Sequence, residues 1–417
     1  MKLPRMIPVR IHVPCPTVDA SEQTLSDALK RIEADTRVAP GERIAVTAGS
    51  RGIYDIDRIL RCVIGRLKSA GAEPFIVPAM GSHAGATAEG QKDFLAGYGI
   101  TEETMGCEIV SSMETVELGT SPLGVEGYCD RNAYDADGIV VVNRVKPHTG
   151  FSSTIGSGLL KMLAIGLGKH KGARHVHQRG VDVGYEEAIR DGGLLALEKL
   201  NIRFGVAVVE NHRGQTAHIE AVVPEDFEAT DELLLARSRE LMGHLPGRFL
   251  HLLIVDEMGK NISGTGMDPN VIGRGMQQEK VKVNAPDVLR LFVRDLTAET
   301  HGNAIGIGFA DFTTDRLVAK IDTHATWTNV LTSVAPWEAH IPIHYPSDRE
   351  AIETALTTAG TTPTDRMRII RIRDTEHIDE ILVSEPVWED LKARDDVEAL
   401  DKPREMTFDE DGNLTDA

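Results

Sequence analysis

The sequence predicts an α/β protein with two domains, each built on a mostly parallel sheet, and with the active site in the cleft between them. Short apolar runs alternate with amphipathic segments, which is typical of strand–helix–strand units. Runs such as 138–146 (GIVVVNRVK) are continuously apolar, as expected for strands covered on both faces. A length of 417 residues is enough for two separate cores.

The first half of the chain has strand-like and helix-like segments in turn. Expected strands have continuous apolar runs, and they cover residues 42–50, 73–83, 138–146 and 204–211. Expected helices have amphipathic or glycine-interrupted apolar patterns, and they cover residues 56–72, 88–99 and 157–168. This alternation predicts one α/β domain over residues 1–245, which would bind the cofactor and carry the catalytic groups.

A second α/β domain is predicted over residues 246–417, closing over the site. Its expected strands cover residues 249–259, 303–312 and 366–374, and its helices cover 314–321 and 349–360. Residues 287–296 fit either a helix or a strand. The segment 224–243 is interpreted as the connection between the domains, and the acidic tail 408–417 is expected to be frayed.

Composition excludes several classes of protein. The net charge of −19 argues against nucleic acid as a partner, because phosphates favour basic surfaces. No apolar run approaches the roughly 20 residues of a membrane span, and the N-terminus lacks a signal peptide's apolar stretch, so we expect a cytoplasmic protein. The cysteines form no CxxC pair and are interpreted as free thiols rather than ligands of zinc or iron–sulfur clusters: Cys15, Cys62, Cys107 and Cys129.

Three polar side chains each follow an expected strand: Arg51, His83 and His148. Ligands of open α/β sheets sit outside the carboxyl ends of strands, so these side chains are candidates for one site. A neutral imidazole takes up a proton near pH 7 and returns it, which suits a pair of histidines to reversible acid/base work. The alternative is that each histidine only hydrogen-bonds its own loop.

Lys161 interrupts the apolar run of the helix expected over 157–168. Burying an ammonium group is costly, so a buried Lys161 needs a partner, a lowered pKa or a covalent bond. Alternatively, its side chain snorkels to the surface. Glycines nearby, among them Gly156 and Gly158, let the backbone approach a ligand closely, and a helix N-terminus there could hold phosphate. No phosphate-loop or dinucleotide fingerprint matches.

His177 is a candidate metal ligand. In an extended segment His175 and His177 would point to opposite sides, so the two are not expected to chelate one ion together. A single protein nitrogen would hold a metal only weakly. The assignment therefore makes sense if a bound organic cofactor supplies the other ligands.

These residues resemble those of the nickel-dependent lactate racemase family, from about residue 41 to the region of residue 337. The strongest matches, in chain order, are His148, the Gly-Phe-Ser segment 150–152, Lys161 and His177. The Lys161-to-His177 interval fits the family's pattern, whereas the interval between His148 and Lys161 is slightly longer here. Looser matches lie at Arg51, at His83, in the THGNAIGIG segment and around Trp327.

The resemblance implies a nickel-pincer nucleotide, a modified pyridinium mononucleotide that binds nickel. It implies roles for six side chains: attachment of the cofactor through a thioamide by Lys161, nickel ligation by His177, acid/base work by His83 and His148, and substrate binding by Arg51 and Trp327. A planar guanidinium such as that of Arg51 suits a substrate carboxylate. Cofactor-synthesis proteins are the implied partners.

The implied reaction interconverts the enantiomers or epimers of a 2-hydroxy acid. One histidine removes the hydroxyl proton while the Cα hydride moves to the cofactor, and hydride returns to the other face of a planar 2-keto acid. Competing interpretations are a hydro-lyase on the same fold, and a non-catalytic protein that binds a sugar phosphate or nucleotide.

The sequence departs from the family's pattern where substrate would be recognised. Ala48 stands where an acidic residue is expected, three positions before Arg51. The family's glutamine and lysine of the second domain have no clean match, although the region holds Lys260, Asp268, Asn270 and Arg274, to which the sequence assigns no roles. We therefore expect a substrate larger or more polar than lactate.

Overall fold

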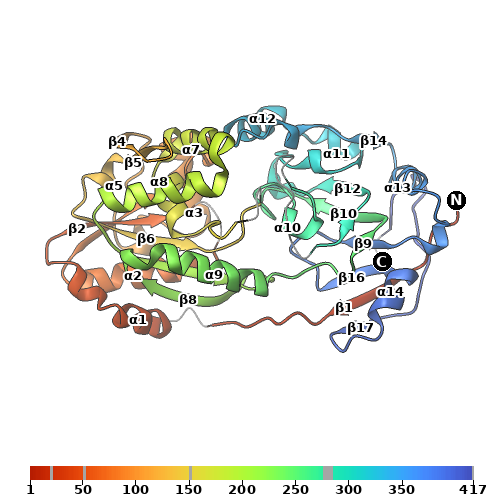
Figure 1. Cartoon of the computed structure of the whole chain (residues 1–417), viewed down its shortest axis with the longest axis horizontal. Coiled ribbons are helices and arrows are strands. Elements are labelled where there is room, and N and C mark those ends of the chain that lie inside the picture. The colour runs from red at the N-terminus through yellow and green to blue at the C-terminus, as the bar shows by residue number, and fades with distance from the viewer. Residues whose placement is uncertain (19–21, 50–52, 150–152, 276–284, 416–417) are drawn as a thin grey trace. The chain divides into compact units, whose positions relative to one another are not determined.

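Two sheets divide the chain into two units in the computed structural model, which describes residues 1–18, 22–49, 53–149, 153–275 and 285–415 (Figure 1). The N-terminal unit comprises residues 15–148 and 153–242. The C-terminal unit comprises residues 1–14 and 243–415, together with Thr149. Both sheets are mostly parallel and have helices on their faces, so the predicted α/β class is confirmed.

The N-terminal unit is built on a five-stranded sheet. Its strand order is β3 (Glu73–Pro78), β2 (Arg43–Ala48), β6 (Gly138–Arg144), β7 (Ile202–Glu210) and β8 (Thr216–Val222). The first four strands are parallel, and β8 is antiparallel to β7. The strands expected at 42–50, 73–83, 138–146 and 204–211 are therefore all present.

Helices cover both faces of this sheet. On one face, α1 (Glu22–Arg31) and α2 (Ile56–Ser69) share an apolar core with β2, β6 and β7. On the other face, Gly205 of β7 leaves room for Phe227 of α9 (Phe227–Leu241) and Leu159 of α6 (Leu159–Lys161). The unit also contains α3 (Ala88–Gly97), α4 (Glu102–Met105), α5 (Arg131–Tyr134), α7 (Lys169–Val183), α8 (Tyr185–Lys199) and the hairpin of β4 (Thr115–Thr120) and β5 (Glu126–Asp130).

The C-terminal unit is built on an eight-stranded sheet. Its strand order is β14 (Ile343–Tyr345), β13 (Phe312–Thr314), β12 (Leu291–Leu296), β10 (Leu252–Met258), β15 (Ile369–Ile372), β16 (Glu380–Ser384), β1 (Met6–Ile11) and β17 (Val397–Ala399). The strands from β14 to β15 are parallel, whereas β16, β1 and β17 each run antiparallel to their neighbours.

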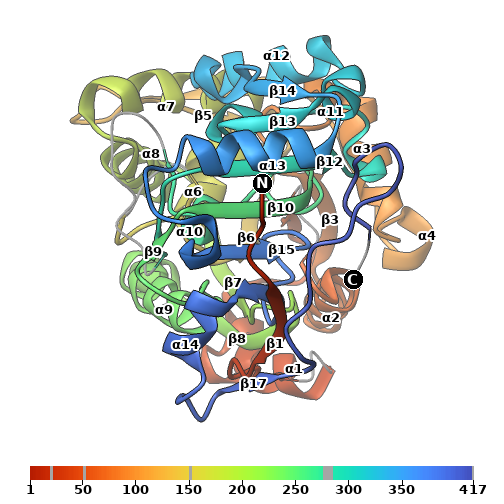
Figure 2. The same cartoon turned by 90° about the vertical axis from the view of Figure 1, so that its right-hand side faces the viewer.

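Helices also cover this second sheet. One face packs against α13 (Asp348–Thr357), which lies over β12, β13 and β14 (Figure 2). The other face packs against α10 (Pro269–Ile272), α11 (Asp315–Ala319) and α14 (Glu385–Leu391). The remaining helix, α12 (Thr323–Thr332), follows α11. Two short strands, β9 (Phe249–Leu250) and β11 (Asp287–Val288), pair with each other.

Four sequence-based expectations need correction. The first strand, β1, belongs to the C-terminal sheet, so residues 1–14 do not lie in the domain expected over 1–245. The expected connection 224–243 forms α9 of the N-terminal unit. The strand expected at 303–312 forms a 3-10 turn at Ile307–Phe309, followed by β13. Residues 408–415 of the tail are folded, because Leu414 is buried and its amide donates to Asp348 at 2.9 Å.

Two simpler expectations find support. All four cysteines are free thiols. Within the described ranges, no helix is both long enough and apolar enough to cross a bilayer.

Candidate active site

The strands β3, β2 and β6 are neighbours and parallel, so their carboxyl ends meet at one edge of the N-terminal sheet. His83 follows the end of β3, and His148 follows the end of β6. Both imidazoles are half-buried. Arg51, expected after β2, lies outside the described residues. The sequence thus correctly placed both histidines after strands that flank β2.

The loop that carries His83 is held by a buried amide. Gln91 of α3 is fully buried, and its Nε2 donates to the carbonyls of Gly81 at 3.1 Å and His83 at 3.4 Å. Ala84 and Ala86 both have φ of 53°, in the left-handed region that alanine rarely adopts. Such strain persists only where the surrounding structure enforces it, and it is common at functional sites.

Lys169 is the buried lysine of this unit, and the sequence interpretation missed it. Its side chain is fully buried, and Nζ donates to the Pro78 carbonyl, to Gln91 Oε1 at 3.2 Å, and forms an ion pair of 3.2 Å with Asp130. Burial lowers the pKa of Lys169, and the Asp130 carboxylate opposes that shift.

Lys169 therefore joins three elements that carry the candidate site. It contacts the end of β3, it fixes the amide that holds the His83 loop, and it is the first residue of α7. A signal for this was present in the sequence. Ile165, Ala173 and Val176 stand four before, four after and seven after Lys169, which places the lysine on an apolar helical face.

The segment before Lys161 packs against the strand end that carries His148. Lys146 and Ser157 exchange backbone hydrogen bonds of 3.0 and 2.9 Å. Gly156 lies so close to this pair that a Cβ there would meet the Lys146 carbonyl oxygen at 2.7 Å and the His148 nitrogen at 3.2 Å. The missing side chain thus permits packing within the chain, and a role for Gly156 in cofactor binding stays a prediction.

A carboxylate, and not a phosphate, occupies the helix N-terminus next to Lys161. Asp231 of α9 accepts hydrogen bonds of 2.9 Å from the amides of both Leu159 and Leu160. A side chain at Gly158 would collide with this carboxylate. Burial raises the pKa of Asp231 to about 6, although the two amides favour its charged form. The expectation that this helix end holds phosphate is therefore wrong.

Lys161 itself is half-buried and directly precedes a π-helical turn, Met162–Gly166. Turns of this kind are rare and frequent at functional sites. The turn packs against the neighbouring strand ends: Gly81 donates to the Gly166 carbonyl at 3.1 Å, and the Met162 methyl lies near Gly49, just after β2. The backbone that carries Lys161 is thereby fixed against the edge that carries the histidines.

His177 lies on α7. The sequence analysis had considered this segment as extended. In a helix, residues two apart still diverge, so the expectation that His175 and His177 do not share an ion holds for a different reason. His175 accepts from the Glu126 amide at 3.1 Å, whereas the half-buried His177 ring lies 6.5 Å from that of Tyr185. The two histidines thus have different surroundings.

The amino-acid sequence of this unit matches a known family. Residues 12–187 match the family model described as the lactate racemase N-terminal domain. The match includes His83, His148, Lys161 and His177, so it covers the strand ends and the helix that carry the candidate groups.

Two solved structures are similar in fold. One is a protein from Thermotoga maritima, at 14% identity, with a TM-score of 0.53 over 78% of this chain and 84% of that chain. The other is the lactate racemase apoprotein from Thermoanaerobacterium thermosaccharolyticum, at 15% identity, with a TM-score of 0.48 over 93% of this chain and 92% of that chain. At such identities the likeness concerns fold alone. No curated protein sequence matches significantly.

The side chains of the described residues restrict how a metal ion can be held. In the part of the chain that the structure describes, no group of three or more histidine, cysteine, aspartate or glutamate side chains is placed to hold a metal ion. A metal at His177 would therefore need other donors, as the sequence analysis expected for a cofactor-borne ion.

The remaining candidates lie in the C-terminal unit. Trp327 is 59% exposed on α12. Arg274 is bound to Asp311 and to the carbonyls of residues 288, 289 and 309. Asp268 caps α10 and bonds the Asn270 side chain at 2.8 Å. These contacts give Arg274, Asp268 and Asn270 structural roles, which removes Asn270 and Arg274 as arguments for a polar substrate.

Lys260 and Glu338 form a polar group that sequence reasoning did not find. Lys260 Nζ donates to the Gly264 carbonyl at 2.9 Å. Glu338 is 3% exposed, and burial raises the pKa of its carboxyl to about 7, against the opposing charge of Lys260. A carboxyl with such a pKa can exchange protons near neutrality.

Proposed function

We propose that the protein is a racemase or epimerase of a 2-hydroxy acid that works with a bound nickel-pincer nucleotide. The observation that carries this proposal is the position of His83 and His148, after two strands that flank β2, within a lactate racemase N-terminal domain. The family match favours a racemase-type function. The substrate and the hydride chemistry are our proposal.

Four residues fit the cofactor. Lys161 would hold it through a thioamide, and His177 would be the protein ligand to nickel. Both side chains are half-buried, so they are reachable, and their backbone is fixed by the π-helical turn and by α7. Gly156 and Gly158 would lie beside it. When bound, the cofactor supplies an acceptor and donor for the substrate's Cα hydride.

The histidines would move the hydroxyl proton. One neutral imidazole accepts the proton from the hydroxyl of the 2-hydroxy acid, and a protonated imidazole returns a proton to the carbonyl oxygen of the 2-keto acid. Two histidines are needed because the two enantiomers present their hydroxyl groups in different directions. Arg51 and Trp327 would bind the substrate, and Gln91 with Lys169 would keep His83 in position.

The preference for a substrate larger or more polar than lactate stays a prediction with reduced support. Ala48 is buried in the apolar core beneath α2, so an acidic side chain at this position would not simply line an open pocket. Lys260 remains as a polar candidate for the far end of a substrate. We expect a longer or polyhydroxylated 2-hydroxy acid to react faster than lactate.

The decisive experiment uses protein co-produced with cofactor-synthesis proteins. Intact mass and nickel content are compared for the parent, Lys161→Ala and Lys171→Ala. Lys171 is an exposed lysine of α7 whose ammonium lies 4.3 Å from the Tyr128 ring, and it serves as the matched control. We expect added mass and nickel in the parent and in Lys171→Ala, and loss of both in Lys161→Ala. Equal contents in all three proteins would contradict the attachment.

A panel of single enantiomers of 2-hydroxy acids then tests the reaction by chiral chromatography. Appearance of the opposite enantiomer supports a racemase. Loss of water from the substrate would support the hydro-lyase, and binding without turnover would support a sugar-phosphate or nucleotide binder. Lactate as the best substrate would remove the expected preference and leave the racemase proposal intact.

A further inference from the structure

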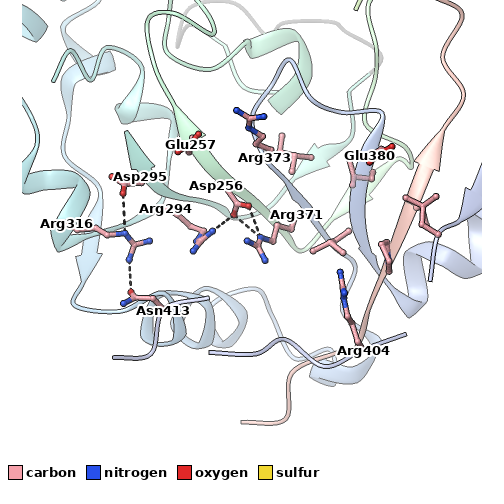
Figure 3. A pocket seen from close by; sticks show the side chains of 16 residues that line it. Asp256, Glu257, Arg294, Asp295, Arg316, Arg371, Arg373, Glu380, Arg404 and Asn413 are labelled. Carbon is pink, nitrogen blue, oxygen red and sulfur yellow. Dashed lines mark hydrogen bonds and ion pairs between the residues drawn. The ribbon is translucent and has the colours of Figure 1, made fainter. Parts of the chain in front are cut away.

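A cavity of about 800 Å³ lies in the C-terminal unit, and none of the residues that line it is named in the proposed function (Figure 3). It is lined by residues of β10, β12 and β15 and by the antiparallel strands β16 and β1. It also contacts the C-terminal tail at Leu400, Arg404 and Asn413. All of its walls belong to this one unit.

The cavity lies at the topological switch point of the second sheet. From β10 the chain proceeds outward through β12, β13 and β14, and it then returns to the other side of β10 as β15. In open α/β sheets, ligands bind where the strand order reverses, near the carboxyl ends of the strands. Asp256 and Glu257 in β10, and Arg371 and Arg373 at the end of β15, line the cavity there.

Guanidinium groups dominate the polar lining of this cavity. The five arginines come from two strands, the residue after β15, a helix and the tail, and they are Arg294, Arg316, Arg371, Arg373 and Arg404. Carboxylates are fewer and are shared: Asp256 binds both Arg294 at 2.8 Å and Arg371 at 2.9 Å. Glu380 forms an ion pair of 2.7 Å with Arg10, which does not line the cavity.

Two of the five arginines are fully used by the protein. Arg294 binds Asp256 and Asp348 at 2.8 Å each and the Leu414 carbonyl at 3.0 Å. Arg316 binds Asp348 at 2.6 Å and Asn413 at 2.7 Å. These contacts hold the tail over the sheet, which explains their presence without any ligand.

Arg404 differs, because its side chain makes no hydrogen bond or ion pair with any described residue. Its backbone is fixed by two bonds to Met6, of 2.8 and 2.9 Å, so its position is enforced. In Figure 3 its guanidinium points into the cavity, toward the side that holds Arg371. Arg373 is likewise weakly engaged, with a 65% exposed side chain and one contact of 3.6 Å to Asp374.

We propose that this cavity binds a small organic oxyanion, with a carboxylate or phosphate group held by Arg404. The N–H donors of a guanidinium group match the oxygens of both a carboxylate and a phosphate in geometry. A bound anion would also reduce the electrostatic repulsion between the unpaired Arg404 guanidinium and the other arginines of the cavity. The apolar side chains of Pro8, Leu382 and Leu400, also in the lining, suit a short carbon skeleton. None of these lining residues takes part in the proposed reaction.

Calorimetric titration of the full chain, without cofactor, tests the proposal with three probes at constant ionic strength. Succinate represents a carboxylate ligand, glycerol 3-phosphate represents a phosphate ester, and succinamide is the uncharged control. Each probe is titrated into the parent, into Arg404→Gln and into Arg366→Gln. Arg366 is an exposed arginine of the same unit outside the cavity.

We expect one anionic probe to bind saturably to the parent and to Arg366→Gln, and succinamide not to bind. Arg404→Gln should weaken binding roughly tenfold or more, as loss of a charge-assisted hydrogen bond predicts. The tighter anion identifies the source of the oxyanion. Binding should also slow hydrogen exchange in residues 400–415, whose contacts close the cavity. Absence of binding by both anions, or equal affinity in Arg404→Gln, would overturn the proposal.

Discussion

The two sheets present different chemistry near the ends of their parallel strands. In the N-terminal sheet, the loops after the parallel strands contain histidines, small residues and strained backbone. In the C-terminal sheet, arginines and carboxylates lie near the strand ends. Imidazole changes its charge near pH 7, while guanidinium keeps its charge at every pH a protein meets. The comparison teaches that one fold class, used twice in a chain, can offer proton transfer in one unit and fixed charge in the other.

The largest expected effect concerns the histidines of the N-terminal unit. His83→Ala and His148→Ala should each lower racemisation about 10²–10⁴-fold in both directions, because every turnover needs one group to remove a proton and another to return it. The measurement is the initial rate from each pure enantiomer. His170→Ala, an exposed histidine of α7, is the control and should keep the parent rate. A double variant at the parent rate would exclude both groups from the reaction.

The next prediction concerns the buried ion pair of the N-terminal unit, Lys169 with Asp130. Lys169→Met leaves Asp130 buried without its partner, so the free energy of unfolding should fall by about 3–5 kcal/mol. Urea titration monitored by fluorescence measures it. The double variant Lys169→Met/Asp130→Asn should regain part of the loss, since the uncharged amide would keep the oxygen that caps α5. A single variant as stable as the parent would show that the ion pair contributes little.

Glu338 is a carboxyl group of the C-terminal unit that, like a histidine, is expected to change its charge near pH 7. Its pKa is raised from 4.5 to about 7, so its contribution to stability is greatest below pH 4.5 and is lost as pH rises toward 7. Glu338→Gln should remove this decrease in stability with rising pH, because glutamine does not ionise. Relative to the parent, the variant should gain up to about 3 kcal/mol between pH 4.5 and 8, as the shift implies. A stability difference independent of pH would contradict the raised pKa.

The smallest effect is expected at the cap of α3. The Thr87 side chain accepts from the Gly90 amide at 3.1 Å, so Thr87→Ala should cost about 1 kcal/mol of stability. Thermal unfolding measures the cost. Ser347→Ala removes the corresponding cap of α13, where Ser347 accepts from the Glu350 amide, and should have a similar effect in the other unit. Strongly different losses would show that one cap also supports its neighbouring loop.

The sequence predicted most strands because a parallel strand covered on both faces has a continuous apolar run. The sequence-based prediction of strands failed where an apolar segment packs its backbone closely against another part of the chain. In the segment 303–312, Gly306 has φ of 90° and approaches the Thr265 carbonyl, while Gly308 approaches that of Trp337, so a 3-10 turn forms in place of a strand. Such contacts join residues far apart in the chain, and local pattern carries no record of them.

The candidate site shows the same limit. His83 and His148 could be found because they follow strands, and strand ends are readable. Lys169 was overlooked in favour of Lys161, since both interrupt apolar surroundings and the apolar helical face around Lys169 was not considered. The acidic tail was expected to fray because its composition is polar, yet Arg294, Arg316 and Asp348 bind it. Hydrogen bonds between segments far apart in the chain cannot be inferred from composition.

The place of β1 has a consequence for the order of folding. This strand leaves the ribosome among the first residues, yet its partners β16 and β17 are among the last to be made. During synthesis the N-terminal unit can close around residues 15–242 while β1 waits, with an unpaired edge. A fragment that ends before residue 380 therefore leaves this strand without its partners, and such fragments should be prone to aggregate through it.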